Sequence, residues 1–279
     1  MMRIFFIVSC FCLLLSCSKE ANVKLPETKP LPVMYSYICP TDTVITLKLF
    51  YSSPLYGANQ VDILAPVPDG DVKISSALGT AQLIFNPITQ YYELLTNTYP
   101  ILPGQVYKMT VTTINGDVAI AETQVPLTTV PINAATIETY TENGSTFDRI
   151  KVSFTDEPGR LNYYRTTALH AFAYTFQPDT IAEDTRICKL YSDMNHDGEN
   201  VSLDGSFALR TDSTAYYSTE YYDIFLYNCS ESYYKFHKSL LNYTGDNPFA
   251  EPTLIYSNVK GGFGCFGAYT RSMLTYKKI

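Results

Sequence analysis

One acidic stretch has the residue types and the spacing of a calcium-binding loop. Calcium is a hard cation that prefers several carboxylate and carbonyl oxygens around a tight turn. Oxygen-bearing side chains occupy the first, third, fifth and twelfth positions and a glycine the sixth: Asp193, Asn195, Asp197, Asp204 and Gly198. Asn200 stands where an apolar residue usually locks the loop, Asp204 is shorter than the usual glutamate, and we expect no flanking helices. The stretch therefore predicts either a calcium site on Asp193, Asn195, Asp197 and Asp204 or an exposed turn.

A second stretch, Gly262-x-Gly264-x-x-Gly267, has the spacing of a dinucleotide-binding fingerprint. That fingerprint binds pyrophosphate only where it follows a strand and opens a helix. The residues from Ala268 to Ile279 alternate like a strand instead. We therefore predict no cofactor, and expect the glycines to mark a bulge or close backbone packing against a helix that begins after Ser230.

The three histidines form no recognisable catalytic pattern. His170 lies in an apolar strand-like run and His237 on an apolar helix face, so we expect both in the core, and His196 has no metal-type partner. No Gly-x-Ser-x-Gly motif occurs. We predict no catalytic residues and no enzyme; the alternative is a hydrolase whose triad is assembled only in space.

Tyrosine pairs offer a different kind of surface. Neighbouring side chains in a strand point to opposite faces, so each strand pair predicts one core ring and one outward ring. The outward rings are candidates for contact with a partner or ligand, and ordinary surface tyrosines are the alternative. The pairs are Tyr91-Tyr92, Tyr163-Tyr164, Tyr216-Tyr217, Tyr221-Tyr222 and Tyr233-Tyr234.

The N-terminus has the pattern of a lipoprotein signal peptide over residues 1–16. Arg3 precedes an apolar run that ends at Leu15 and is shorter than the ~20 residues that span a bilayer. Leu14-Leu15-Ser16-Cys17 resembles a bacterial lipobox, which predicts attachment of membrane lipid, such as palmitate, to Cys17. A cleaved signal with an unmodified cysteine is the alternative. Residues 17–32 are polar and proline-containing, as expected of an extended tether.

Composition indicates a globular, β-rich chain. Of 279 residues, 17% are charged and 14% aromatic, and the net charge is −7 without a basic cluster, so we expect no nucleic-acid partner. Export would permit disulfides. The sequence is consistent either with two disulfide bridges or with isolated buried thiols among Cys39, Cys188, Cys229 and Cys265.

Residues 33–126 predict an immunoglobulin-like or prealbumin-like β domain. Short alternating runs are separated by turn signals, of which Asn115-Gly116 is the clearest. A two-residue loop there would place Val111 opposite Ile120 and Thr113 opposite Val118. The expected buried face is Tyr107, Met109, Val111, Val118 and Ile120. A linker near Val125–Pro131 follows.

Residues 132–279 predict a larger β domain with one helix near 230–243. Ser230 is placed to cap this helix and Gly245 to end it, and Glu231 and Lys235 form a favourable pair. Its apolar face is expected to be Tyr233, Phe236, His237, Leu240 and Leu241. The fold class is thus mainly β, with two sandwich-like domains.

Three motifs together resemble one family. They are Asp156-x-Pro158-Gly159-x-x-Asn162-Tyr163-Tyr164-Arg165, Asn247-Pro248-Phe249 and Asn258-Val259-x-Gly261-Gly262-x-Gly264-x-Phe266-Gly267-Ala268-Tyr269. Their order and spacing are similar to those of the domain-of-unknown-function 4249 family. The resemblance implies an outer-membrane lipoprotein of Bacteroidota, often encoded beside a TonB-dependent receptor, in either leaflet. The function expected is a non-enzymatic binding accessory to a TonB-dependent transporter, with a structural or adhesive envelope protein as the alternative.

Overall fold

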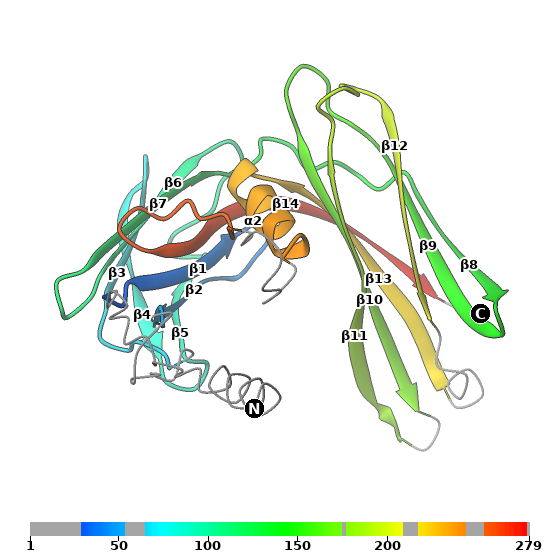
Figure 1. The fold of residues 1–279 in the computed structure, drawn as a ribbon, viewed down its shortest axis with the longest axis horizontal. Coiled ribbons are helices and arrows are strands. Elements are labelled where there is room, and N and C mark those ends of the chain that lie inside the picture. The colour runs from blue at the N-terminus through cyan, green and yellow to red at the C-terminus, as the bar shows by residue number, and fades with distance from the viewer. Residues whose placement is uncertain (1–28, 54–64, 175–176, 209–216, 244–253, 278–279) are drawn as a thin grey trace, which may run out of the picture.

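The computed structural model describes residues 29–53, 65–174, 177–208, 217–243 and 254–277 (Figure 1). The predicted signal peptide, Cys17, most of the tether and Gly245 lie outside these residues. No described helix is both long and apolar enough to cross a membrane.

The described chain is built mainly of strands, which confirms the predicted fold class. The N-terminal lobe contains β1 (Pro32–Ile38), β2 (Val44–Tyr51), β3 (Asp71–Ser76), β4 (Gly79–Asn86), β5 (Tyr91–Leu95), β6 (Val106–Thr112) and β7 (Val118–Gln124). The C-terminal lobe contains β8 (Ala134–Glu142), β9 (Ser145–Thr155), β10 (Tyr163–Tyr174), β11 (Gln177–Ser192), β12 (Asn200–Ala208) and β13 (Tyr217–Cys229). Helix α2 (Glu231–Leu241) and strand β14 (Phe263–Lys277) follow.

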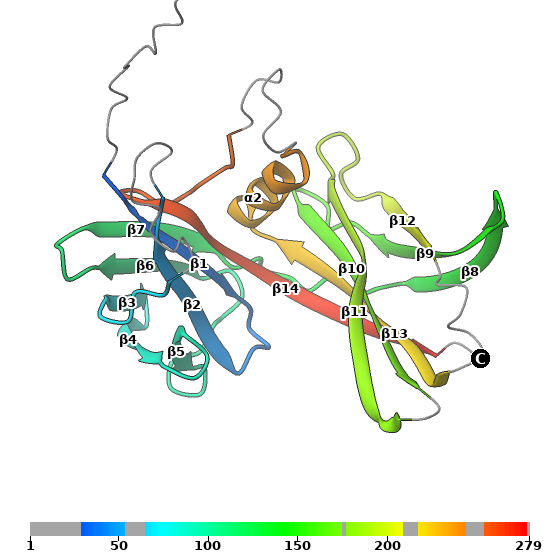
Figure 2. The same cartoon turned by 60° about the horizontal axis from the view of Figure 1, so that its bottom comes forward.

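Strand β14 joins the two lobes. The main sheet has the order β11-β10-β13-β14-β1-β2-β5-β4-β3-β6-β7, and β14 lies parallel to β1 but antiparallel to β13. Figure 2 shows β14 running from one lobe into the other. The last strand of the chain therefore crosses the boundary expected near residues 126–132.

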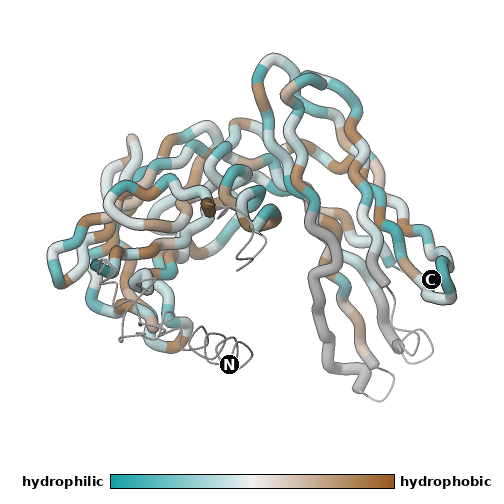
Figure 3. Tube along the Cα trace, in the orientation of Figure 1, coloured by the Kyte–Doolittle hydropathy of each residue, from teal (hydrophilic) through white to brown (hydrophobic). Residues whose placement is uncertain are grey.

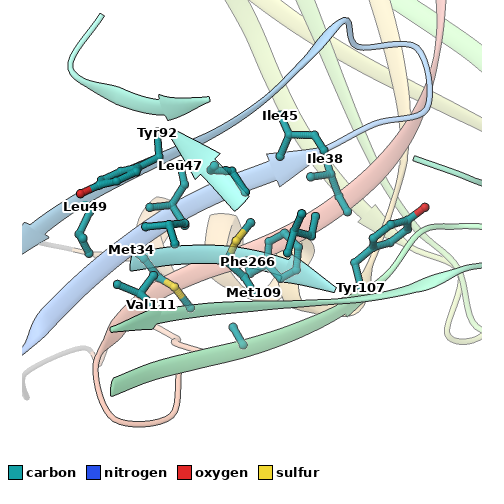
Figure 4. Packing of buried hydrophobic residues seen from close by; sticks show 14 of the residues in the cluster. Met34, Ile38, Ile45, Leu47, Leu49, Tyr92, Tyr107, Met109, Val111 and Phe266 are labelled. Carbon is teal, nitrogen blue, oxygen red and sulfur yellow. The ribbon is translucent and has the colours of Figure 1, made fainter. Parts of the chain in front are cut away.

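The core of the N-terminal lobe includes residues from this last strand. Phe266 and Ala268 are buried with Met34, Leu47 and Met109, and Figure 4 shows the Phe266 ring among the side chains of β1, β2 and β6. Burying a large apolar side chain contributes about 1.5–3 kcal/mol. The N-terminal lobe thus depends on residues encoded near the end of the chain.

The hairpin between β6 and β7 has a three-residue loop instead of the predicted two-residue loop. The Thr113 amide donates to the Asp117 carbonyl at 2.9 Å, and the Gly116 amide donates to the Thr113 carbonyl at 2.9 Å. Gly116 has a φ of 81°, which places it in the left-handed region that suits glycine. The extra loop residue moves β7 by one position, so Val111 lies opposite Ala119.

This shift exchanges the two faces of β7, because side chains alternate along a strand. Tyr107, Met109 and Val111 are buried as predicted. The prediction was wrong for β7: Val118 is exposed and Ile120 only partly buried, whereas Ala119 and Ala121 are buried.

The C-terminal lobe packs a smaller sheet, ordered β12-β9-β8, against the main sheet. Ile150 and Val152 of β9 contact Ala168, Tyr222 and Ile224 of the main sheet, and further along a second cluster is formed by Phe154, Tyr164, Val201 and Leu226. Figure 3 shows hydrophobic and hydrophilic residues in short alternating stretches along the strands of both lobes. This pattern is expected where one face of each strand packs and the other meets solvent.

The segment between β7 and β8 is attached to the main sheet. The Thr128 carbonyl accepts hydrogen bonds from Thr270 Oγ1 at 2.7 Å and Asn228 Nδ2 at 3.3 Å. The Val130 carbonyl accepts one from Ser272 Oγ at 2.8 Å. These bonds hold the predicted linker against β13 and β14.

Helix α2 begins where the sequence predicts. Ser230 Oγ accepts a hydrogen bond from the Tyr233 amide at 3.3 Å, and Glu231 and Lys235 form a 2.7 Å ion pair. Tyr233, Tyr234 and Phe236 are buried. The predicted apolar face was wrong in its last turn, because Leu240 and Leu241 are exposed.

Candidate functional site

A pocket of about 710 Å³ lies where the two lobes meet. Its walls come from Glu122–Val125 at the end of β7, Arg160–Asn162 before β10, Ser230–Ser232 at the start of α2, and Tyr256 and Asn258. This volume falls within the range of about 300–1,000 Å³ typical of small-ligand pockets. Of the two pockets described here, it has the larger volume.

Aromatic and polar side chains line this pocket together. The Tyr163 hydroxyl donates to Glu231 Oε1 at 3.4 Å, and its ring centroid lies 4.7 Å from that of Tyr234. Arg160 forms an ion pair with Glu157 and also donates to Thr128 Oγ1 at 3.2 Å. The walls therefore suit a ligand that has both apolar surface and hydrogen-bonding groups.

The tyrosine pairs behave as the strand alternation predicts. Tyr92, Tyr164 and Tyr222 are buried while their neighbours are half-buried or exposed. The outward ring of one pair, Tyr163, lies in the pocket wall. Tyr233 and Tyr234 belong to a helix, so the alternation of a strand does not apply to them, and both are buried. The side chains of the pair at 216–217 lie outside those that the structure describes.

Asn258 holds one side of the pocket in place. Its Oδ1 accepts from the Phe266 amide at 3.0 Å, and its Nδ2 donates to the carbonyls of Phe266 at 2.8 Å and Glu122 at 3.1 Å. These bonds join the segment before β14 to β7 and to β14 itself. Asn258, a residue of the third motif, therefore has a structural role, which is to hold these backbone segments together.

The glycines of the same motif allow close backbone packing, as expected. A Cβ on Gly267 would lie 2.9 Å from Tyr233 Cβ on α2. A Cβ on Gly264, whose φ is 110°, would lie 2.0 Å from the Met34 carbonyl oxygen. The glycines lie before and within strand β14, and no helix follows them among the described residues. The spacing that resembles a dinucleotide fingerprint is therefore explained by close packing of the backbone.

Three carboxylates form an acidic cluster beside the pocket wall. Asp156, Asp193 and Asp197 each place one oxygen within 4.8 Å of the others. Asp156 follows β9, whereas Asp193 and Asp197 lie in the turn between β11 and β12. Asp156 and Asp193 are buried and Asp197 is exposed, so the cluster is open to solvent on one side.

Hydrogen bonds fix the orientation of the acidic cluster. Asp156 accepts from the Tyr164 hydroxyl at 2.6 Å and from the Gly198 amide at 2.7 Å. Asp193 Oδ1 accepts from the Asn162 amide at 2.9 Å. Asp197 accepts from the Gly159 amide at 2.8 Å. Thus the loop that follows β9 and the acidic turn support each other.

Burial and the nearby Asp156 carboxylate raise the pKa of Asp193, although the Asn162 amide acts in the opposite direction. Its second oxygen, Oδ2, is buried and has no hydrogen-bond partner among the described residues.

The structure brings together only part of the predicted calcium loop. Asp193 and Asp197 belong to the acidic cluster, whereas Asn195 is exposed in the turn. Asp204 lies on β12 opposite Lys151, in a separate shallow pocket that also contains Arg149. Asp156, which belongs to the first family motif and lies outside the predicted calcium loop, completes the cluster instead.

A second polar group, the Arg165 cluster, consists of Arg165, Tyr233 and His237. Tyr233 is buried, whereas Arg165 and His237 are half-buried, so His237 lies at the edge of the core and not within it as predicted. The Arg165 guanidinium donates to the Tyr233 hydroxyl and lies 3.4 Å from His237 Nε2. The ring centroids of Tyr233 and His237 are 4.3 Å apart. Burial, and then the Arg165 charge, lower the pKa of His237 to about 3, so this imidazole is neutral at physiological pH.

The other two histidines occupy different surroundings. His170 is buried, as predicted, and its ring centroid lies 4.7 Å from that of Tyr222. His196 is exposed and lies 3.0 Å from Glu199. The polar neighbours of His196 and His237 are the Glu199 carboxylate and the Arg165 guanidinium.

The described cysteines do not form two disulfides. Cys39 and Cys265 are buried thiols, and Cys229 is also buried. Burial raises the pKa of Cys265 to about 12, which keeps this thiol protonated. The side chain of Cys188 lies outside the described residues.

Comparison with protein families gives a match over residues 18–275 to the domain of unknown function (DUF4249). The chain belongs to this family. The match covers both lobes and begins one residue after Cys17. In this DUF4249 protein, the first motif supplies Asp156 to the acidic cluster, Asn162 as a hydrogen-bond donor to that cluster, and Arg165 to the Arg165 cluster. The third motif contains Gly264 and Gly267, which allow the close backbone contacts.

Comparison with curated proteins gives no match. Among solved structures, a Salmonella alpha-2-macroglobulin mutant is similar at 12% identity and a TM-score of 0.24. The alignment covers 94% of the DUF4249 chain and 15% of the macroglobulin chain.

Proposed function

We propose that this protein is an outer-membrane lipoprotein, anchored through Cys17, that binds a small molecule or peptide as a non-enzymatic accessory of a TonB-dependent transporter. The anchor rests on the lipobox at residues 14–17. The partnership rests on what the family resemblance implies. The binding role rests on one structural observation, the pocket of about 710 Å³ between the lobes.

The pocket supports binding because elements from both lobes form it. These elements are connected to one another, because β14 pairs with β1 and with β13 and the Thr128 carbonyl accepts a hydrogen bond from Thr270 of β14. A preorganised pocket binds with a smaller entropic cost than one that must assemble around its ligand. A passive structural or adhesive role is the alternative, and it would not need this pocket.

Copurification from native membranes tests the proposal. The full chain with a C-terminal tag is expected in the membrane fraction with acylated Cys17, together with a TonB-dependent receptor. The Cys17→Ala variant is expected in the soluble fraction, because acyl chains supply the membrane affinity. Unmodified Cys17 in the native protein, or repeated failure to recover a receptor, would contradict the proposal.

The pocket is tested separately by Leu161→Arg. Leu161 is 49% exposed and lines the pocket, so a long charged side chain should obstruct it without disturbing the core. Ile88→Arg is the control, since Ile88 is 91% exposed in the β4–β5 turn. The measurement is the amount of copurifying ligand, detected by mass spectrometry. We expect Leu161→Arg alone to lower it at least roughly ten-fold, which corresponds to a loss of about 1.4 kcal/mol of binding free energy. Equal retention by both variants would favour the structural role.

A further inference from the structure

The acidic cluster holds negative charge without a cation from the protein. None of Asp156, Asp193 and Asp197 forms an ion pair with lysine or arginine in the part of the chain described. Carboxylates that share a site repel unless a proton or a cation neutralises them. Their three oxygens nevertheless lie within 4.8 Å of one another.

A separate observation indicates where a ligand would bind. Asp193 is only 2% exposed, and its Oδ2 atom is buried without a hydrogen-bond partner. The same carboxylate adjoins Asp156. Buried carboxylate oxygens normally have a partner, because an unsatisfied one loses the hydration that it had in the unfolded chain. This oxygen therefore has lone pairs available on a carboxylate that belongs to the acidic cluster.

We propose that Asp156, Asp193 and Asp197 together bind a calcium ion. Calcium takes carboxylate oxygens at 2.3–2.6 Å, so ligands on opposite sides of the ion are separated by about 5 Å or less. The 4.8 Å limit among the three oxygens satisfies this condition. The exposed Asp197 gives the ion a route from solvent and leaves room for water to complete its coordination.

This ligand set differs from a calcium loop of continuous sequence. Asp193 and Asp197 come from the tight turn at Gly198, whose φ is 73°, and Asp156 comes from the loop after β9. A bound ion would connect the two segments more strongly than the existing amide–carboxylate bonds do. Since Arg160–Asn162 continue from this loop into the pocket wall, the ion would also order that wall.

Thermal unfolding of the chelator-treated full chain, with added CaCl2, tests the site. At calcium about one hundred times the dissociation constant we expect the melting temperature to rise by about 5–10 °C. Asp193→Asn should abolish this rise, and without calcium it should leave the protein as stable as wild type or more stable, because it removes one of the repelling charges. Asp204→Asn, outside the acidic cluster, should retain the full calcium response.

Asp197→Asn provides a second variant on an exposed side chain, in case Asp193→Asn folds poorly. It should weaken calcium binding at least about ten-fold, equivalent to 1.4 kcal/mol. Hydrogen exchange at the amides of Gly159, Asn162 and Gly198 should slow when calcium is added.

Three results would overturn the proposal. The first is no melting shift at about 10 mM calcium, above the weakest affinities of extracellular calcium modules. The second is an equal response to magnesium, which would remove the assignment to calcium. The third is the same loss of response in Asp204→Asn as in Asp193→Asn. None of these results depends on the pocket ligand or on a transporter, so they are distinguishable from failure of the proposed function.

Discussion

The first residues of β10 separate two polar clusters of different character. Because side chains alternate, Tyr164 points toward the acidic cluster, while Arg165 points toward helix α2. On the helix side, a guanidinium contacts a neutral hydroxyl, a neutral imidazole and an aromatic face. On the other side, three carboxylates converge and one buried oxygen has no partner.

This difference indicates which polar cluster is structural and which is a candidate site. The Arg165 cluster joins β10, α2 and β1 through contacts among its own residues and Tyr37. The acidic cluster draws its carboxylates from two segments of the chain and includes no lysine or arginine partner among the described residues. A motif of four consecutive residues, Asn162-Tyr163-Tyr164-Arg165, therefore serves both a packed interface and a candidate ion site.

The largest expected effect comes from removing the Tyr164 ring. Tyr164 is fully buried, and its ring centroid lies 4.7 Å from that of Phe154. Tyr164→Ala should lower the free energy of unfolding by about 3–5 kcal/mol. Tyr164→Phe should lower it by about 1–2 kcal/mol, because it keeps the ring and loses only the hydroxyl's bonds to Asp156 and to the Glu157 amide. Denaturant unfolding measures both. Equal losses would mean that the hydroxyl, and not the ring packing, supports this face.

A methyl group at Gly267 should disturb the helix face. The added Cβ would lie 2.9 Å from Tyr233 Cβ. Because both Cβ atoms are attached directly to the backbone, of β14 and α2 respectively, a side-chain rotation cannot relieve this contact. Gly267→Ala should therefore cost about 1–3 kcal/mol and speed hydrogen exchange in α2. Gly144→Ala is the control: space around it is open, and only its left-handed backbone adds about 1 kcal/mol. Unchanged stability of Gly267→Ala would contradict the close packing of the Arg165 cluster.

The smallest effect is a pH dependence from His237. Burial and Arg165 hold the folded pKa near 3, below the ordinary value of 6.5. As the pH falls, His237 therefore takes up a proton in the unfolded chain before it does so in the folded protein. The stability that neutral His237 contributes to the fold is thus present above pH 6.5 and is lost as the pH falls toward 3. Between pH 6.5 and 4.5, wild type should lose about 2 kcal/mol more than His237→Gln. The same pH slope in both proteins would show that His237 is not kept neutral by the fold.

Local signals in the sequence were sufficient for the helix and for most strand faces. Ser230 caps α2 as predicted because capping needs only the amide three residues on. Tyr107, Met109 and Val111 are buried as their alternation predicts. The register of β7 was not predictable from Asn115-Gly116 alone, since the same residues also fit a three-residue loop that reverses the faces.

The candidate site required information from distant parts of the chain. Asp193 and Asp197 could be recognised from their spacing, whereas Asp156 joins them only because β9 and β12 pair, bringing Thr155 opposite Asn200. Asp204 fails to join because β12 carries it along the ladder to Lys151. Spacing predicts a turn and its ligands, but it does not indicate which other loop closes over that turn.

By itself, the sequence determined a mainly β chain, the start of α2, the alternation of core and surface side chains, and the glycines that must pack closely. Only the tertiary structure decided that β14 lies beside β1, that Phe266 belongs to the N-terminal core, and that Asp156 completes the acidic cluster. The physical reason is that periodicity and capping act over a few residues. Strand partners are chosen by the total burial and hydrogen bonding of segments far apart in the chain.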